Sequence, residues 1–154
     1  MKQATLCLLI KENEILLAMK KRGFGVGKYN GVGGKVADDE SIEAAAVRET
    51  KEEIGVDIKN LEKVGVLHFH FPYKTEWDQD VHLFLAKSWE GEVKESEEMA
   101  PKWFKKNKIP YGKMWDDDKH WLPHILSGKK LEAKFVFKEA EKIDKFDIKI
   151  VEEI

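Results

Sequence analysis

The sequence predicts a single mixed α/β domain, because strand-like segments occur toward both ends of the chain and a strong helix signal lies between them. The chain has 154 residues, which is within the usual size of one domain. Its hydrophobic fraction of 42% is sufficient for a buried core, and no repeat, low-complexity segment or linker divides it. We therefore treat residues 1–154 as one domain.

The first part of the chain predicts two strands, a long loop and a helix. Apolar, β-rich runs at 5–10 and 15–19 are separated by a short polar break. Residues 20–34 are rich in glycine and basic groups, so neither a helix nor a regular strand suits them. Residues 41–53 follow three acidic residues that favour the helix dipole, contain three consecutive alanines, and end before Gly55, a typical helix stop.

The rest of the chain predicts more strands, a second helix and a closing hairpin. Apolar and polar residues alternate at 64–71 and 81–85, as in half-buried strands. The second helix is expected to run from about Asp116–Asp118 to Leu126, and Pro123 is tolerable there only in or near the first turn. Alternation near the C-terminus predicts two further strands, around 131–137 and 146–150.

Composition excludes several classes of function. With 27 basic and 29 acidic residues the formal net charge is −2, which argues against binding to nucleic acid polymers. One cysteine cannot form an internal disulfide, so we expect a reducing, cytoplasmic setting. No segment approaches 18 apolar residues and no signal peptide pattern is present, so we expect no membrane insertion. Without a coiled-coil heptad, the default expectation is a monomer.

Three carboxylates share one face of the predicted first helix. Glu49, Glu52 and Glu53 are three and four residues apart, so they lie close together and repel one another. A divalent cation with a preference for oxygen ligands, Mg²⁺ or Mn²⁺, would relieve this repulsion. The alternative is a solvated acidic face that Arg48 and Lys51 balance.

The surrounding segment resembles the Nudix box, G-x5-E-x7-R-E-U-x-E-E-x-G-U, in which U is a bulky aliphatic residue. Gly34, Glu40 and residues 48–56 match every residue of fixed identity, and the one departure is Thr50 in an aliphatic position. The resemblance implies an α/β/α sandwich with a mixed central sheet. It also implies hydrolysis of a nucleoside diphosphate linked to another group.

The resemblance also implies roles for the motif residues. Glu49, Glu52 and Glu53 would bind metal together with a backbone carbonyl at Gly33 or Gly34, and Arg48 would orient the glutamates. Bound metal lowers the pKa of a water that attacks phosphorus. Glu98 resembles a further metal ligand of such sites, although it could also be an exposed loop acid.

The rest of the chain resembles the MutT-like members of this family, which hydrolyse the oxidised purine nucleotides 8-oxo-dGTP and 2-oxo-dATP to monophosphate and pyrophosphate. The similar segments are 19–25, 29–36, 80–82, 98–99 and 114–118. Aromatic rings would stack on the base, and amide and carboxyl groups would bind its polar edge. The candidate substrate-binding residues are Thr5, Lys20, Phe24, Asn30, Gly34, Lys35, Phe69, Trp115, Asp117, Asp118 and Trp121.

Asp117 and Asp118 are neighbours in a predicted apolar pocket, so one of them is expected to keep its proton. That proton could let one pocket accept both oxidised guanine and oxidised adenine. Each pocket residue also has a structural alternative: the tryptophans could be core residues, the aspartates could favour a helix start, and Asn30 could form a turn.

Departures from the MutT-like pattern leave other substrates open. Asp116 replaces proline, Val32 replaces an aromatic residue, and Tyr29 replaces tryptophan. The connection from Phe71 to Asp80 is one residue longer. Ordinary or methylated nucleoside triphosphates and sugar nucleotides are alternative substrates. A non-catalytic nucleotide-binding module is an alternative from another class, although it would be expected to lose a box glutamate.

Overall fold

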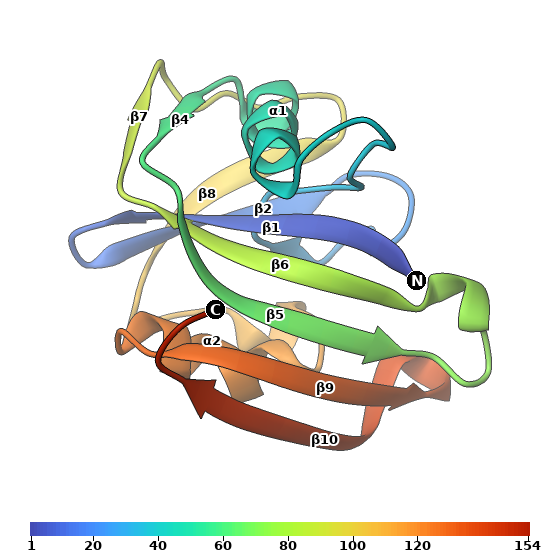
Figure 1. Ribbon diagram of the computed structural model, residues 1–154. Coiled ribbons are helices and arrows are strands. Elements are labelled where there is room, and N and C mark those ends of the chain that lie inside the picture. Colours follow the sequence, from blue (N-terminus) through green and yellow to red (C-terminus); the bar gives the residue numbers. More distant parts are fainter.

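The computed structural model describes all residues, 1–154, and consists of a large sheet, a small sheet and two helices (Figure 1). The strands of the large sheet are β1 (Lys2–Lys11), β2 (Glu14–Lys20), β3 (Tyr29–Asn30), β5 (Glu62–His70), β6 (Gln79–Ala86), β8 (Met99–Lys105), β9 (Lys130–Lys138) and β10 (Lys142–Val151). The small sheet pairs β4 (Asp57–Lys59) with β7 (Ser88–Glu90). The helices are α1 (Ile42–Ile54) and α2 (Asp118–Leu126), and the short 3₁₀ turns are η1 (Thr75–Trp77), η2 (Tyr111–Lys113) and η3 (Glu139–Glu141).

The large sheet is mixed, as predicted. Its strand order is β10-β9-β5-β6-β1-β2-β3, and β8 also pairs with β2. The pairs β1–β6 and β5–β9 are parallel, and the other pairs are antiparallel. The parallel pairing of β1 with β6 brings the N-terminal strand to the centre of the sheet.

The two helices lie on opposite faces of this sheet, which confirms the α/β/α sandwich (Figure 1). Side chains alternate along β1, so Cys7 and Leu9 pack on the α1 side. Leu6 and Leu8 belong to the core on the α2 side, together with Trp121. Each face therefore has its own core, and β1 contributes to both.

Helix α1 begins and ends as its sequence predicts. The Ser41 hydroxyl accepts a hydrogen bond from the Ala44 N–H at 3.1 Å, and Gly55 ends the helix in the left-handed region at φ 78°. Thr50, the departure from the motif, is fully buried and donates its hydroxyl to the Ala46 carbonyl at 2.8 Å. The buried hydroxyl is therefore satisfied within the helix.

The expectation for Pro123 was wrong, because this proline is the sixth of nine residues in α2. Its missing N–H would have bonded the carbonyl of Lys119, and both residues are exposed, so water can satisfy that carbonyl. The opposite side of α2, with Trp121, Leu122 and Ile125, packs against the sheet. Packing on the buried side thus holds the helix together across the proline.

Sequence patterns did not predict β4, β7 and β8. Strand β8 pairs with β2 along seven residues, from Glu14↔Lys105 to Lys20↔Met99. Its sequence, MAPKWFK, has no clean alternation and contains a proline.

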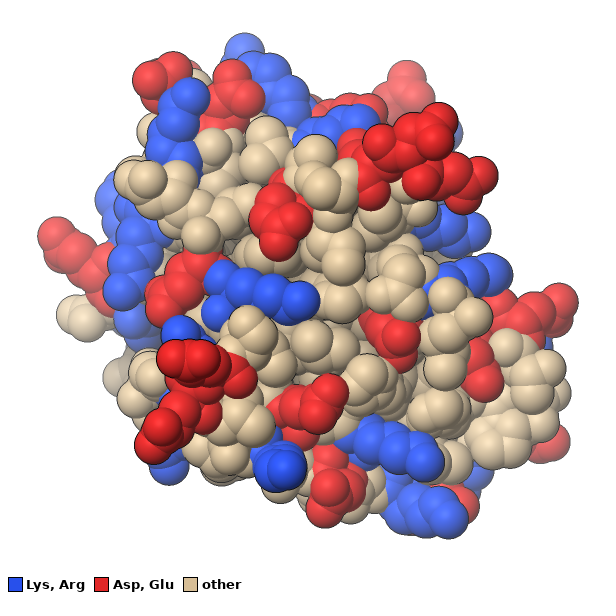
Figure 2. Space-filling view, in the orientation of Figure 1, with Lys and Arg blue, Asp and Glu red and all other residues tan.

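Neither helix is long and apolar enough to cross a membrane. Positive and negative side chains are interspersed over the face shown in Figure 2.

Candidate active site

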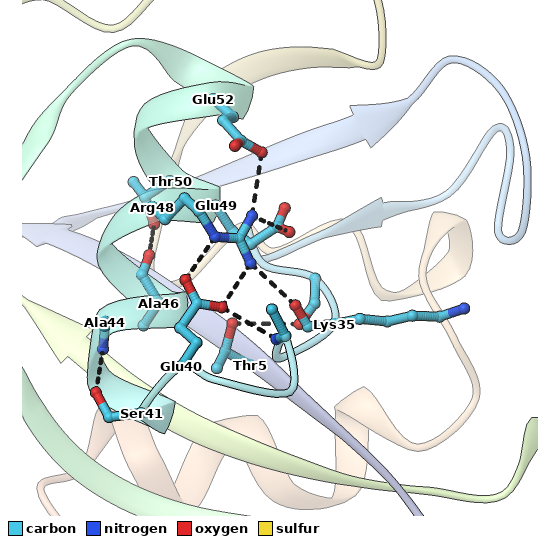
Figure 3. Close-up of polar contacts among 12 residues, drawn as sticks. Thr5, Lys35, Glu40, Ser41, Ala44, Ala46, Arg48, Glu49, Thr50 and Glu52 are labelled. Carbon is cyan, nitrogen blue, oxygen red and sulfur yellow. Dashed lines mark hydrogen bonds and ion pairs between the residues drawn. The ribbon is translucent and has the colours of Figure 1, made fainter.

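Arg48 connects the acidic residues of the motif (Figure 3). Its guanidinium donates to both carboxylate oxygens of Glu40, at 2.6 and 2.8 Å, and to the Lys35 carbonyl at 3.1 Å. A third nitrogen lies 2.9 Å from Glu49 and 3.3 Å from Glu52. The bond from Arg48 lowers the pKa of Glu40 to about 2. Arg48 thus ties the loop before α1 to two of the three glutamates, which is the role expected of it.

Glu53 lies deeper than the other glutamates. Its carboxylate accepts a hydrogen bond from the Gly33 N–H at 2.9 Å and is 95% buried. Burial, together with the nearby charges of Glu49 and Glu98, raises its pKa to about 8, although the Gly33 bond opposes this rise. Burial contributes most to this rise, and the neighbouring carboxylates add to it.

The glycine pair before α1 lies very close to its neighbours, which are backbone at Gly33 and a flexible side chain at Gly34. A Cβ on Gly33 would lie 1.8 Å from the Thr5 carbonyl oxygen, and a Cβ on Gly34 would lie 2.5 Å from the Glu49 carboxylate. The Gly34 carbonyl accepts from the Thr5 N–H at 2.9 Å, whereas the Gly33 carbonyl accepts no backbone hydrogen bond. Of the two expected carbonyl ligands, Gly33 is therefore the one with a free oxygen.

Glu98 joins the acidic cluster from a distant part of the chain. A surface hollow is lined only by polar residues, namely Glu49, Glu52, Glu53, Ser96, Glu97 and Glu98. No three His, Cys, Asp or Glu side chains converge closely enough to form a ready metal cage. Four of the five carboxylates, those of Glu49, Glu52, Glu53 and Glu98, are the expected ligands, and together with the free Gly33 carbonyl they suit a hard divalent cation.

A cavity of about 400 Å³ lies beside this cluster. Every substrate-binding residue that the sequence predicted lines it: Thr5, Lys20, Phe24, Asn30, Gly34, Lys35, Phe69, Trp115, Asp117, Asp118 and Trp121. They come from β1, β2, β3, β5 and α2, from the loop between β2 and β3, and from the loops before both helices. Because Gly33 and Gly34 line the cavity and also contact the glutamates, the cavity and the acidic cluster are adjacent.

Aromatic side chains provide much of the cavity wall. The rings of Phe24 and Trp115 have centroids 5.0 Å apart, and Phe69 lies 5.7 Å from Phe137 in an edge-to-face arrangement. Such surfaces stack on flat heteroaromatic ligands. Trp121 is 1% exposed, so it is a core residue, as one alternative expected, and it also lines the cavity.

Asp117 and Asp118 are the polar groups of the cavity on the α2 side. They are 2% and 3% exposed. The Trp121 indole N–H donates to Asp117 at 2.7 Å, whereas one oxygen of Asp118 is buried without a hydrogen-bond partner. Burial raises the pKa of both groups, and the neighbouring Asp117 raises that of Asp118 further. Neither side chain caps α2, so the pair faces the cavity instead of serving the helix start.

Asn30 lies in β3, paired with Ala18, and its φ is not positive, so the turn alternative was wrong. Its side-chain oxygen accepts from the Gly31 N–H at 2.9 Å, and the same side chain lines the cavity. Its amide N–H₂ has no protein partner in the structure and is available to a ligand.

Several cavity residues were missed. Lys28 lies with its ammonium 5.6 Å from the Trp115 ring centroid, and Trp77 and Phe137 add two aromatic walls. The alternation of Phe135 and Phe137 could have placed Phe137 on the α2 side. Trp77 lies in an irregular connection, where no periodic signal exists.

Comparisons with known proteins agree with this site. The NUDIX domain family matches residues 1–125. The chain is 45% identical to an oxidized purine nucleoside triphosphate hydrolase from Danio rerio over 99% of this chain and 97% of that protein. A Mus musculus protein of the same name is 43% identical over 96% and 94%. The solved structure of a MutT protein from Bacillus halodurans is similar, with a TM-score of 0.85, 27% identity and coverage of 96% and 97%.

The matched residues 1–125 include all of the motif and its acidic helix, together with the aspartate pair and Trp121. The alignments to the fish and mouse proteins extend over nearly the whole chain, so the C-terminal hairpin is part of the similarity as well. The chain belongs to the Nudix hydrolase family.

Proposed function

We propose that this protein hydrolyses oxidised purine nucleoside triphosphates, 8-oxo-dGTP and 2-oxo-dATP, to the monophosphate and pyrophosphate, and so removes damaged nucleotides from the nucleotide pool. The observation that supports this most strongly is the adjacency of a purine-sized aromatic cavity to a cluster of four glutamates, with Gly33 and Gly34 between them. The names of the fish and mouse relatives agree with it.

Enzymes of this family use a divalent metal ion, and we propose Mg²⁺, with Mn²⁺ as a substitute. Glu49, Glu52, Glu53 and Glu98 would hold it with the Gly33 carbonyl. When bound, the ion neutralises phosphate charge and activates the attacking water. Arg48 keeps Glu49 and Glu52 in place, since its contacts fix one end of each carboxylate.

The chain's own residues would select and orient the substrate. Trp115 and Phe69 offer faces for stacking, and Asn30 offers an amide donor. Asp117 and Asp118 with one shared proton offer both a donor and acceptors to the polar edge of the base. Lys20 and Lys35 line the cavity on the side of the glycine loop, where they would meet the phosphates.

The site is complete within one chain, which supports a monomer as the working unit. A single cysteine that is fully buried suits a reducing, cytoplasmic compartment.

The test is kcat/KM for 8-oxo-dGTP against dGTP with Mg²⁺, together with identification of the products. We expect a preference of at least tenfold, about 1.4 kcal/mol in transition-state binding, and release of pyrophosphate. Glu52→Gln is the control that should abolish hydrolysis without loss of the fold. Equal rates for both nucleotides would overturn the assigned base selectivity, and hydrolysis of neither would overturn the proposed substrate class.

A further inference from the structure

Trp77 is an aromatic wall of the base cavity that no sequence motif predicts. It lies in η1, within the connection between β5 and β6, and is half-buried. This connection is also the segment whose length departs from the MutT-like pattern. Trp77 is therefore a feature of this chain that could alter the cavity without altering the metal site.

Trp77 supports Phe24, which lies between two indoles. The Phe24 centroid is 4.8 Å from that of Trp77, with the rings 65° apart, and 5.0 Å from that of Trp115, with the rings 33° apart. Phe24 is 46% exposed and lies in a loop whose glycines at 23, 25 and 27 have positive φ. Backbone hydrogen bonds hold the loop, such as that from the Gly27 N–H to the Lys20 carbonyl at 2.8 Å, and the contacts with the two indole rings orient the Phe24 side chain.

Trp77, in contrast, is restrained by its own neighbours. The Phe71 ring packs against it at 5.6 Å and 88°, and the Lys74 ammonium lies 4.3 Å from the Trp77 ring centroid. Its backbone N–H also donates to the Lys74 carbonyl at 3.0 Å. Trp77 thus offers a restrained surface to the Phe24 ring.

The ring spacing shows that Phe24 and Trp115 form one aromatic surface. Aromatic rings pack with centroids about 4.5–7 Å apart, so two rings that hold a base between them must be at least about 9 Å apart. Phe24 and Trp115 are 5.0 Å apart, so no base fits between them. A base can instead stack across both rings, and Trp77 supports the Phe24 side of that surface.

We propose that Trp77 is a specificity-determining residue, which acts by positioning Phe24 beside Trp115 and so extends the aromatic surface that the base meets. This inference rests on the proposed function, since it concerns the base of that substrate. A purine has a larger flat face than a pyrimidine, so it gains more from Phe24 in this position.

The test is a double-mutant cycle of Trp77→Leu and Phe24→Leu, with kcat and KM measured for 8-oxo-dGTP and dCTP. An edge-to-face ring contact changes binding by about 2- to 13-fold. We therefore expect Trp77→Leu to raise KM for 8-oxo-dGTP by about 3- to 10-fold, to leave kcat within about twofold, and to reduce the preference over dCTP. In the Phe24→Leu background the same change should have no further effect.

Two matched variants separate positioning from general stability. Trp77→Phe keeps an aromatic edge and should retain most of the affinity. Tyr73→Leu removes a ring that contacts Trp77 at 6.2 Å but does not line the cavity, and it should leave KM unchanged. Independent, additive effects of Trp77→Leu and Phe24→Leu, or an equal loss in Tyr73→Leu, would overturn the proposal.

The same cycle can be measured as binding, which separates this inference from the proposed function. Titration of dGMP and dCMP in EDTA, followed by tryptophan fluorescence, needs no hydrolysis. If the unaltered enzyme fails on 8-oxo-dGTP but Trp77 and Phe24 remain coupled in dGMP affinity, the proposed function is overturned and the role of Trp77 stands. Absence of any dGMP binding would overturn both.

Discussion

One side-chain oxygen of Asp118 is buried without a hydrogen-bond partner, and this destabilises the folded chain before any ligand binds. A polar group left unpaired in this way costs about 1–3 kcal/mol. Natural proteins retain such costs mainly where function needs them. With Asp117 beside it, the pair can hold one proton in more than one position, and this is the basis for proposing that its donor pattern adapts to the base.

Asp117→Asn should therefore change activity on 8-oxo-dGTP and on 2-oxo-dATP unequally. The side-chain oxygen of asparagine can still accept the Trp121 hydrogen bond. Its NH₂ group, however, can only donate, whereas the second oxygen of the aspartate could donate or accept, depending on its protonation. The substrate that needs an acceptor there should lose at least about fivefold more in kcat/KM, which corresponds to about 1 kcal/mol. Steady-state kinetics on both nucleotides measures this, and equal losses would contradict a shared, exchangeable proton.

A polar network joins adjacent strands on the side of the sheet that faces away from the base cavity. His68 on β5 bonds Asp80 on β6 at 2.6 Å and Glu132 on β9 at 3.1 Å. Gln3 on β1 donates to Asp80 at 2.9 Å and accepts from His82 at 2.7 Å. Burial alone would lower the pKa of His68, but its bonds to Asp80 and Glu132 outweigh burial and raise it.

His68→Gln should make stability less dependent on pH above 6.5. A histidine whose pKa is raised on folding stabilises the folded state fully at pH values below its pKa in the unfolded chain, near 6.5. That stabilisation is lost as the pH rises through the raised pKa of the folded state. Urea unfolding between pH 5.5 and 8.5 should show the largest difference between wild type and variant at the acid end. His124→Gln, on α2 at the other face, is the control. A constant difference across this range would show that charge on His68 is irrelevant.

Prediction succeeded for elements with local signals and failed where partners are distant in sequence. Helix α1 has its cap, stop and alanines within one segment, and the motif located Glu49, Glu52 and Glu53 on it. Strand β8 has no such signal, because its pairing with β2 determines its structure. Trp77 was missed for the same reason, since only the tertiary fold brings η1 to the cavity. Resemblance supplied most of the substrate-binding residues, and spacing alone would not have assembled them.

At the scale of the whole molecule, the fold places two different sites around one short loop. Strand β1 in the centre of the sheet pairs with the glycine segment through Thr5 and Cys7. One side of that segment faces the base cavity, and the other contacts the glutamates of α1. Backbone atoms of the glycine segment therefore set the distance between the cavity proposed for the base and the acidic cluster proposed for the phosphates. Backbone atoms vary less in position than side chains would.

Gly34→Ala tests this arrangement, and Gly112→Ala is its matched control. A Cβ at Gly34 would lie 2.5 Å from the Glu49 carboxylate, which is the flexible end of a side chain, whereas a Cβ at Gly112 would meet nothing within 4 Å. We expect Gly34→Ala to fold, with a melting temperature within a few degrees of wild type, because Glu49 can move. The displaced carboxylate should lower kcat at least tenfold and raise the Mg²⁺ concentration needed for half-maximal activity. Gly112→Ala should leave both unchanged. Full activity in Gly34→Ala would mean that the position of Glu49 against this glycine is not required for catalysis.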